Sequence, residues 1–145
     1  MAKQSARDRA DALLAAWNRR DYDAVSSQLA PGFVLADHTR HRLSEGPGGY
    51  VDRFRSLLDA FPDMRGEANS VLAEGNLVVQ ETTWRGRHTA PLSAPGYGNI
   101  APTNEEMTIH LVTYMEFDDE GRIKGMRAYG DLAEVPLAAH PAGVG

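Results

Sequence analysis

The 145-residue sequence contains no cysteine, so disulfides, thiolate metal sites and a cysteine nucleophile are all excluded. It also lacks a cluster of basic residues and has a net charge of −5. That balance argues against a nucleic-acid partner, because Lys and Arg form the usual electrostatic footprint of such proteins. No apolar run reaches the roughly 18 residues needed to span a bilayer, and no apolar leader follows the N-terminus. We therefore expect a cytoplasmic protein without a membrane or nucleic-acid partner.

What the sequence contains is typical of one globular domain. A chain of this length can bury a substantial core. Its 42% hydrophobic and 24% charged residues are ordinary proportions for such a domain. Neither an internal repeat nor a linker rich in glycine, proline or serine divides it. The sequence therefore predicts a single domain that covers residues 1–145.

Three segments carry the i, i+3, i+4 spacing of apolar residues that is typical of amphipathic helices. The first covers residues 5–20, and a short second one covers residues 22–29. The third covers residues 50–61, has the most continuous apolar face, and is ended by Pro62. Most of the helical signal therefore lies in the first half of the chain.

The second half of the chain carries mainly strand patterns. Alternating or β-branched runs predict strands at residues 33–36, 67–73, 77–87, 107–117 and 122–131. The last two are joined by an acidic turn at residues 118–121, and a Pro- and Gly-rich loop is expected at residues 88–104. Helices followed by strands predict an α+β fold with a curved, antiparallel sheet and helices packed on one face. Such a sheet encloses a cone-shaped cavity, which is a natural small-molecule site.

Two candidate catalytic residues, Asp37 and His38, end the first predicted strand. Because neighbouring residues of a strand point to opposite faces, only one of them can face a cavity. His38 and His41 also have an H-x-x-H spacing that is compatible with metal ligands, but no third ligand is evident. The sequence therefore predicts neither a metal site nor another cofactor.

Two further candidate catalytic residues lie in the C-terminal hairpin. His110 is in the middle of the strand at residues 107–117, where an imidazole could shuttle a proton or simply face solvent. Asp131 could be a general base beside apolar groups. It could also cap a helix, since Asp131 and Glu134 have the spacing of a capping box.

Four side chains are candidates for binding a hydrophobic substrate. Trp84, Tyr114 and Tyr129 could stack on a flat polycyclic ligand, or they could be plain core. Glu81 could be a pocket acid or a solvent-facing strand residue. The loop at residues 88–104 could be a lid over the cavity or a contact between subunits.

Six short phrases occur in one order along nearly the whole chain: AWNRRD (16–21), AFPDM (60–64), EGNLV (74–78), GRHT (86–89), APTN (101–104), and GRI (121–123) followed by Asp131. In this order they resemble the SnoaL-like polyketide cyclases of the nuclear-transport-factor-2-like superfamily. The resemblance implies a cone-shaped α+β fold, a hydrophobic small-molecule substrate and a homodimer or higher homo-oligomer. It also implies cofactor-independent acid/base chemistry of the kind used in polyketide metabolism and antibiotic biosynthesis.

The sequence departs from the aldol cyclases of that family at two positions. Their catalytic Asp corresponds to Ala128 here, seven positions after Gly121, and their His corresponds to Thr113. The leading hypothesis is therefore an enzyme of the cyclase or isomerase type whose proton-transfer group comes from elsewhere, such as Asp37 or His38. A cofactor-independent hydroxylase or hydrolase on the same scaffold is one alternative. A non-catalytic ligand-binding or dimerisation module is another.

Overall fold

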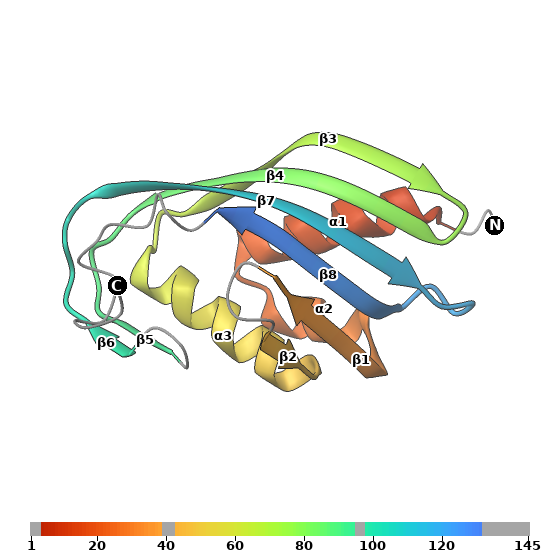
Figure 1. The fold of residues 1–145 in the computed structure, drawn as a ribbon, viewed down its shortest axis with the longest axis horizontal. Helices are drawn as coiled ribbons and strands as arrows, with labels where there is room; N and C mark the ends of the chain where they lie inside the picture. The colour runs from red at the N-terminus through yellow and green to blue at the C-terminus, as the bar shows by residue number, and fades with distance from the viewer. Residues whose placement is uncertain (1–3, 39–42, 95–97, 132–145) are drawn as a thin grey trace.

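The computed structural model describes residues 4–38, 43–94 and 98–131 (Figure 1). Within these ranges the helices are α1 (Ala6–Arg19), α2 (Tyr22–Ser27) and α3 (Pro47–Ala60). The strands are β1 (Leu29–Asp37), β2 (Leu43–Glu45), β3 (Arg65–Glu74), β4 (Leu77–Arg87), β5 (Leu92–Ala94), β6 (Gly98–Ile100), β7 (Glu106–Phe117) and β8 (Ile123–Asp131). None of the described helices is long and apolar enough to cross a membrane.

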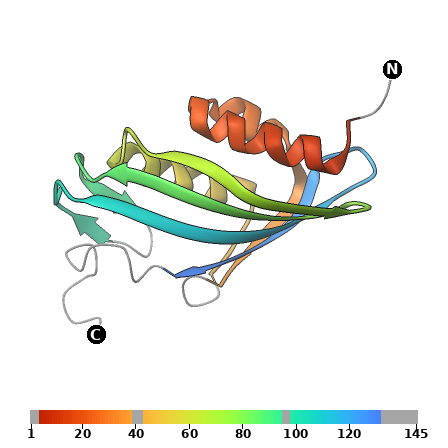
Figure 2. The same ribbon diagram turned by 90° about the horizontal axis from the view of Figure 1, so that it is seen from above.

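Six strands form one sheet in the order β2-β1-β8-β7-β4-β3. Figure 2 shows that the sheet is curved and that α1 and α3 lie on the same side of it. The predicted α+β fold is thus confirmed. The sheet is antiparallel, as predicted, except that β1 and β8 are parallel. A parallel pair requires a long crossover, and here the whole chain between β1 and β8 supplies it.

The helices cover one face of the sheet only, and burial alternates along the strands accordingly. In β7, Ile109 and Met115 are buried against the helices, whereas His110 and Glu116 are exposed. Since side chains of a strand alternate between its two faces, one face of the sheet is an apolar inner face. The other is an outer face with a mixture of polar and aromatic groups.

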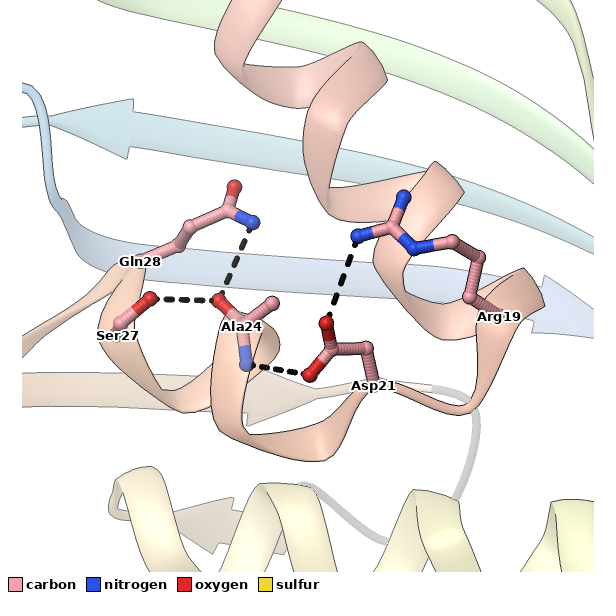
Figure 3. Close-up of polar contacts among 5 residues, drawn as sticks. All are labelled: Arg19, Asp21, Ala24, Ser27 and Gln28. Carbon is pink, nitrogen blue, oxygen red and sulfur yellow. Dashed lines mark hydrogen bonds and ion pairs between the residues drawn. The ribbon is translucent and has the colours of Figure 1, made fainter.

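The junction between α1 and α2 shows how local polar contacts fix a short helix (Figure 3). The Asp21 carboxylate caps α2 by accepting a hydrogen bond from the Ala24 backbone N–H at 3.1 Å. Ser27 Oγ and Gln28 Nε2 donate to the Ala24 carbonyl at 2.9 and 3.3 Å. Asp21 also lies 3.7 Å from Arg19, but both side chains are exposed, so this ion pair contributes little. Capping therefore stabilises a six-residue helix that is too short to be stable alone.

Several element boundaries differ from those that the sequence predicts. α3 begins at Pro47 instead of residue 50, because proline is well suited to the first helical position, where its missing N–H costs nothing. The loop predicted at residues 88–104 contains a small hairpin of β5 and β6. Each of these strands has three residues, which is too few to show a two-residue period in the sequence.

The predicted acidic turn between β7 and β8 is present and is held by α1. Asp118 Oδ1 accepts hydrogen bonds from the backbone N–H groups of Glu120 and Arg122, each at 2.9 Å. Arg9 of α1 donates to the carbonyl of Gly121 at 3.2 Å. Gly121 has φ +82°, and a Cβ there would lie 2.3 Å from the Arg9 guanidinium carbon. The positive φ therefore favours glycine at this position, and a larger side chain would also displace the Arg9 guanidinium.

A buried imidazole, that of His88, links the two ends of the long connection between β4 and β7. His88 is fully buried and stacks on Phe61, with 4.9 Å between ring centroids. Its Nδ1 accepts a hydrogen bond from the Thr103 backbone N–H at 3.2 Å. The neutral ring therefore carries its proton on Nε2. Burial lowers the pKa of His88, and the backbone of Ala90 partly opposes this effect.

This histidine should make stability depend on pH. Because its folded-state pKa is lowered, the unfolded chain binds more protons than the native state at pH values between that pKa and about 6.5. The free energy of unfolding should therefore be at its full value above about pH 6.5 and fall as the pH drops towards 5. Urea titrations of wild type and His88→Gln across this range test the prediction.

The glutamine variant should be less stable overall but should lack most of the pH dependence. His110→Gln, which changes an exposed histidine, is the matched control and should keep the wild-type slope. Equal slopes for His88→Gln and wild type would contradict the assignment.

Candidate functional site

A cavity of about 70 Å³ lies between the inner face of the sheet and α3. Its walls are mainly apolar and include Leu35, Leu57, Trp84, Ile109, Leu111 and Met126. We call it the main cavity. Apolar walls with few polar groups are typical of small-molecule sites.

A second chamber of about 50 Å³ lies beside the main cavity, towards α1. The two spaces share Tyr50, Phe54, Trp84, Leu111, Thr113 and Met126 as lining residues. They are therefore neighbouring parts of one hollow in the core. An apolar cavity of about 150 Å³ holds a single benzene ring, so this hollow is narrow and must widen to admit a polycyclic ligand.

One ion pair faces this apolar space. Asp37, at the end of β1, and Arg53, on α3, are the charged residues among the described lining of the main cavity. Arg53 Nη2 lies 2.9 Å from Asp37 Oδ2, and both side chains are more than nine-tenths buried. Burying two charges is costly unless they are paired, so the contact fixes α3 against β1 at the edge of the cavity.

The position of Asp37 relative to Thr113 and Ala128 follows from the strand register. Thr113 pairs with Ala128 across β7 and β8, and Ala128 pairs with Asp37 across β8 and β1. All three residues line the main cavity. They therefore form a row across three strands, which we call the cross-sheet row. Thr113 and Ala128, the positions that the family resemblance assigns to an acid/base pair, are neighbours in this row. The Asp37 carboxylate lies one strand further along the row.

Asp37 and His38, the two candidates at the end of the first strand, lie on opposite faces of the sheet, as the alternation of side chains along a strand requires. Asp37 points into the main cavity, whereas His38 is exposed and stacks on Tyr129 with 4.6 Å between ring centroids. His41 lies outside the described residues. The prediction that only one of the two neighbours faces the cavity is confirmed, and the one is Asp37.

Four other candidates lie on the outer face, which corrects their expected place beside the pocket. Glu81 and His110 are exposed, and Thr83 Oγ1 lies 3.2 Å from His110 Nδ1. Tyr114 is half-buried and contacts the ring of Tyr129 edge-on. The reason is that each follows or precedes an inward-facing residue by one position on its strand.

The two remaining candidates have different outcomes. Trp84 is buried and lines both chambers. The backbone of Asp131 ends β8 opposite His110, but its side chain lies outside the described residues. The alternative in which Asp131 caps a helix concerns residues that follow it, and these lie outside the described part of the chain.

Arg53 is a cavity residue that the sequence prediction missed, although the sequence contains a signal for it. The apolar stripe of α3 includes Tyr50, Phe54 and Leu57. Arg53 stands three residues after the first of these and four before the last, so it occupies a core-facing position of the stripe. A charge at such a position requires a buried partner.

An α+β domain with a curved sheet, helices on one face and an apolar cavity between them is the architecture that the family resemblance in the sequence implies. The chain belongs to the SnoaL-like polyketide cyclase family, whose profile matches residues 7–137. No curated protein matches the chain.

Solved structures show the same fold. AclR from Streptomyces galilaeus, a candidate hydroxylase, is 22% identical over 92% of this chain and 94% of its own, with a TM-score of 0.78. IdmH from Streptomyces antibioticus, a candidate polyketide cyclase, is 19% identical over 93% and 98%, with a TM-score of 0.77. A SnoaL-like protein from Jannaschia sp. CCS1 is 21% identical over 96% and 97%, with a TM-score of 0.76. At these identities the likeness establishes the fold.

The buried ion pair should couple the stabilities of its two residues. Asp37→Asn or Arg53→Met should each lower the free energy of unfolding by about 3 kcal/mol, because each removes one member of a buried ion pair. The double variant should lose less than the sum of the two. Urea unfolding at pH 7 measures all three values.

The same helix supplies a matched control. Arg55 and Asp59 lie 4.0 Å apart on the surface of α3. Arg55→Met and Asp59→Asn should each change stability by less than about 1 kcal/mol and should add simply. Additive losses at Asp37 and Arg53 would show that their contact is not energetically coupled.

Proposed function

We propose that this protein binds a hydrophobic carbonyl compound in the main cavity and moves a proton on it with Asp37, without a metal or organic cofactor. The observation that supports this is the Asp37–Arg53 pair at the edge of an otherwise apolar space. A carboxylate in a site that excludes water is suited to act as a general base. The substrate class is that of polyketide-type metabolism, in keeping with the family.

The chemistry uses both members of the pair. Asp37 takes a proton from the carbon next to the substrate carbonyl, and the electron pair of that C–H bond moves onto the carbonyl oxygen to form an enolate. Arg53, whose guanidinium carries five N–H donors, stabilises the oxyanion. In a β,γ-unsaturated ketone the product is a dienolate, and return of the proton to its γ-carbon moves the C=C bond and completes an isomerisation. Attack of the enolate carbon on a second carbonyl forms the C–C bond of an aldol cyclisation.

The alternative of a cofactor-independent hydroxylase or hydrolase keeps one specific argument. Ala128 and Thr113 leave the main cavity without the acid/base pair of the aldol cyclases, and AclR is a candidate hydroxylase. A carbanion formed by Asp37 could react with O₂ instead of a second carbonyl. Oxygen uptake in the presence of the substrate distinguishes this outcome from cyclisation, and incorporation of labelled water would indicate a hydrolase.

Proton abstraction can be tested with a slender ketone that suits the narrow hollow. Wild type should accelerate exchange of the methylene protons of phenylacetone with D₂O above the buffer rate, as measured by NMR. Asp37→Asn should lower the enzymatic rate at least about 100-fold, because general-base catalysis contributes that much. Glu81→Gln removes an exposed outer-face carboxylate and should keep the wild-type rate.

Two outcomes would contradict the proposal. Binding of phenylacetone without any exchange in wild type would favour the alternative of a non-catalytic binding module. Unchanged exchange in Asp37→Asn would show that another group is the base. If Asp37→Asn is too unstable to assay, the double variant Asp37→Asn/Arg53→Met can be used for the same test, because it removes both charges of the ion pair.

We also propose that the protein is a homodimer that pairs through the outer face of the sheet. Three large apolar side chains in the described part of the chain are exposed, namely Val34, Leu72 and Tyr129 at 49%, 69% and 40%. All three lie on the outer face, by the alternation of β1, β3 and β8. Val34 and Tyr129 lie on neighbouring strands, whereas Leu72 lies on β3 at the far edge of the same face; exposed apolar groups of this kind can mark an interface. The cytoplasmic location expected from the sequence remains a prediction.

Light scattering after size exclusion should therefore give twice the mass of one chain. Tyr129→Arg should shift the protein towards monomer, because it places a charge in the middle of the apolar contact. Ala12→Arg changes an exposed residue of α1 and should leave the dimer intact. A monomeric wild type would refute the proposal.

A further inference from the structure

We propose that Gln80 is a positioning residue that binds an acceptor oxygen at the end of the ligand remote from Asp37. This inference rests on the proposed function, because it assigns the reacting end of the ligand to Asp37 and Arg53. It adds a second polar subsite and restricts the class of substrate. The ligand would be a slender, mostly apolar ketone that carries a second oxygen at its far end.

The first observation is that the amide of Gln80 is buried without a protein partner. The residue is 5% exposed, and its Nε2 has no hydrogen-bond partner among residues 4–38, 43–94 and 98–131. A buried donor left unsatisfied is destabilising by comparison with an apolar side chain of similar shape. An amide at this core position is thus explained by a group that enters the second chamber and accepts its hydrogen bond.

The second observation is the place of Gln80 in the sheet. It pairs with Thr113 across β4 and β7, which extends the cross-sheet row to Gln80, Thr113, Ala128 and Asp37. The ends of this row are separated by three strand spacings, about 14 Å. Gln80 lines the second chamber and Asp37 lines the main cavity. The row therefore has a polar group in each of two neighbouring chambers, and the proposed ligand would span both.

The walls between the two ends define the middle of the ligand. Phe54 and Trp84 line both chambers on the side of the helix and of β4. Their rings are 5.1 Å apart and meet edge-on. The residue of the cross-sheet row on β8 is Ala128, whose small side chain leaves space in the main cavity. The ligand would have a single aromatic ring in its middle, with its ketone at Asp37 and its second oxygen at Gln80, and the two chambers would widen to admit it.

Two matched probes test the subsite. The first is 1-(4-methoxyphenyl)propan-2-one, whose methoxy oxygen can accept a hydrogen bond. The second is 1-(4-ethylphenyl)propan-2-one, which has nearly the same shape without that oxygen. Wild type should bind the methoxy probe about tenfold more tightly by isothermal titration calorimetry, the effect of one buried hydrogen bond.

The variants locate the donor. Gln80→Met keeps the length of the side chain without its donor and should abolish the preference for the methoxy probe. Thr82→Val removes a hydroxyl from the same chamber and should preserve it. Thermal unfolding confirms that each variant is folded before binding is compared.

Three results would overturn the assignment: equal affinity of wild type for the two probes, an unchanged preference in Gln80→Met, or no binding of either probe. Equal affinity would show that an ordered water satisfies the amide. Methylene-proton exchange, followed on the same complexes, separates this inference from the proposed function. A preference lost in Gln80→Met with no exchange in wild type would support the subsite and refute the chemistry. Proton exchange that depends on Asp37, with no preference for the methoxy probe, would support the chemistry and refute the subsite.

Discussion

The helices cover only one face of the sheet, and this constraint decides what each strand residue can do. A residue that faces α1 and α3 is either core or cavity lining, whereas its neighbour in the chain reaches the outer surface. Asp37 and His38 show the consequence most directly, since one reaches the cavity and the other stacks on an exposed tyrosine. A shift of one residue in β1 would exchange their roles. The candidate chemistry therefore depends on the register of β1 against β8.

The Asp37–Arg53 pair has an energetic meaning beyond its contact distance. Two well-packed apolar residues would often give equal or greater stability than a buried ion pair. The pair lies where the apolar cavity meets the end of β1, so it supplies a base and a permanent positive charge at one point of a water-excluding space. Strong electrostatic effects on a reacting group require such a setting. The proposed function explains the presence of these charges better than stability does.

The sequence predicts the fold more completely than the site, for physical reasons. Helix and strand periods are local, so α1, β4 and the hairpin of β7 and β8 follow from spacing alone. The inward or outward direction of a strand depends on which face the helices cover, which is a tertiary property. For this reason Glu81 and His110 could be found as candidates but not placed. Arg53 was detectable as a charge within an apolar stripe, but its partner Asp37 became known only from the fold.

The cross-sheet row clarifies how this cavity differs from that of the aldol cyclases it resembles. The carboxylate stands on β1, beside Ala128 of β8, so it reaches the same hollow from a neighbouring strand. There the carboxylate contacts Arg53 of α3. Because α3 packs against β1, a residue in the middle of β8 would approach this arginine less directly. A carboxylate on β1 is thus beside a group that can stabilise an oxyanion. Proton transfer therefore remains possible although β8 carries Ala128 in place of the family's acid. The proposed base on β1 would reach a different part of the ligand.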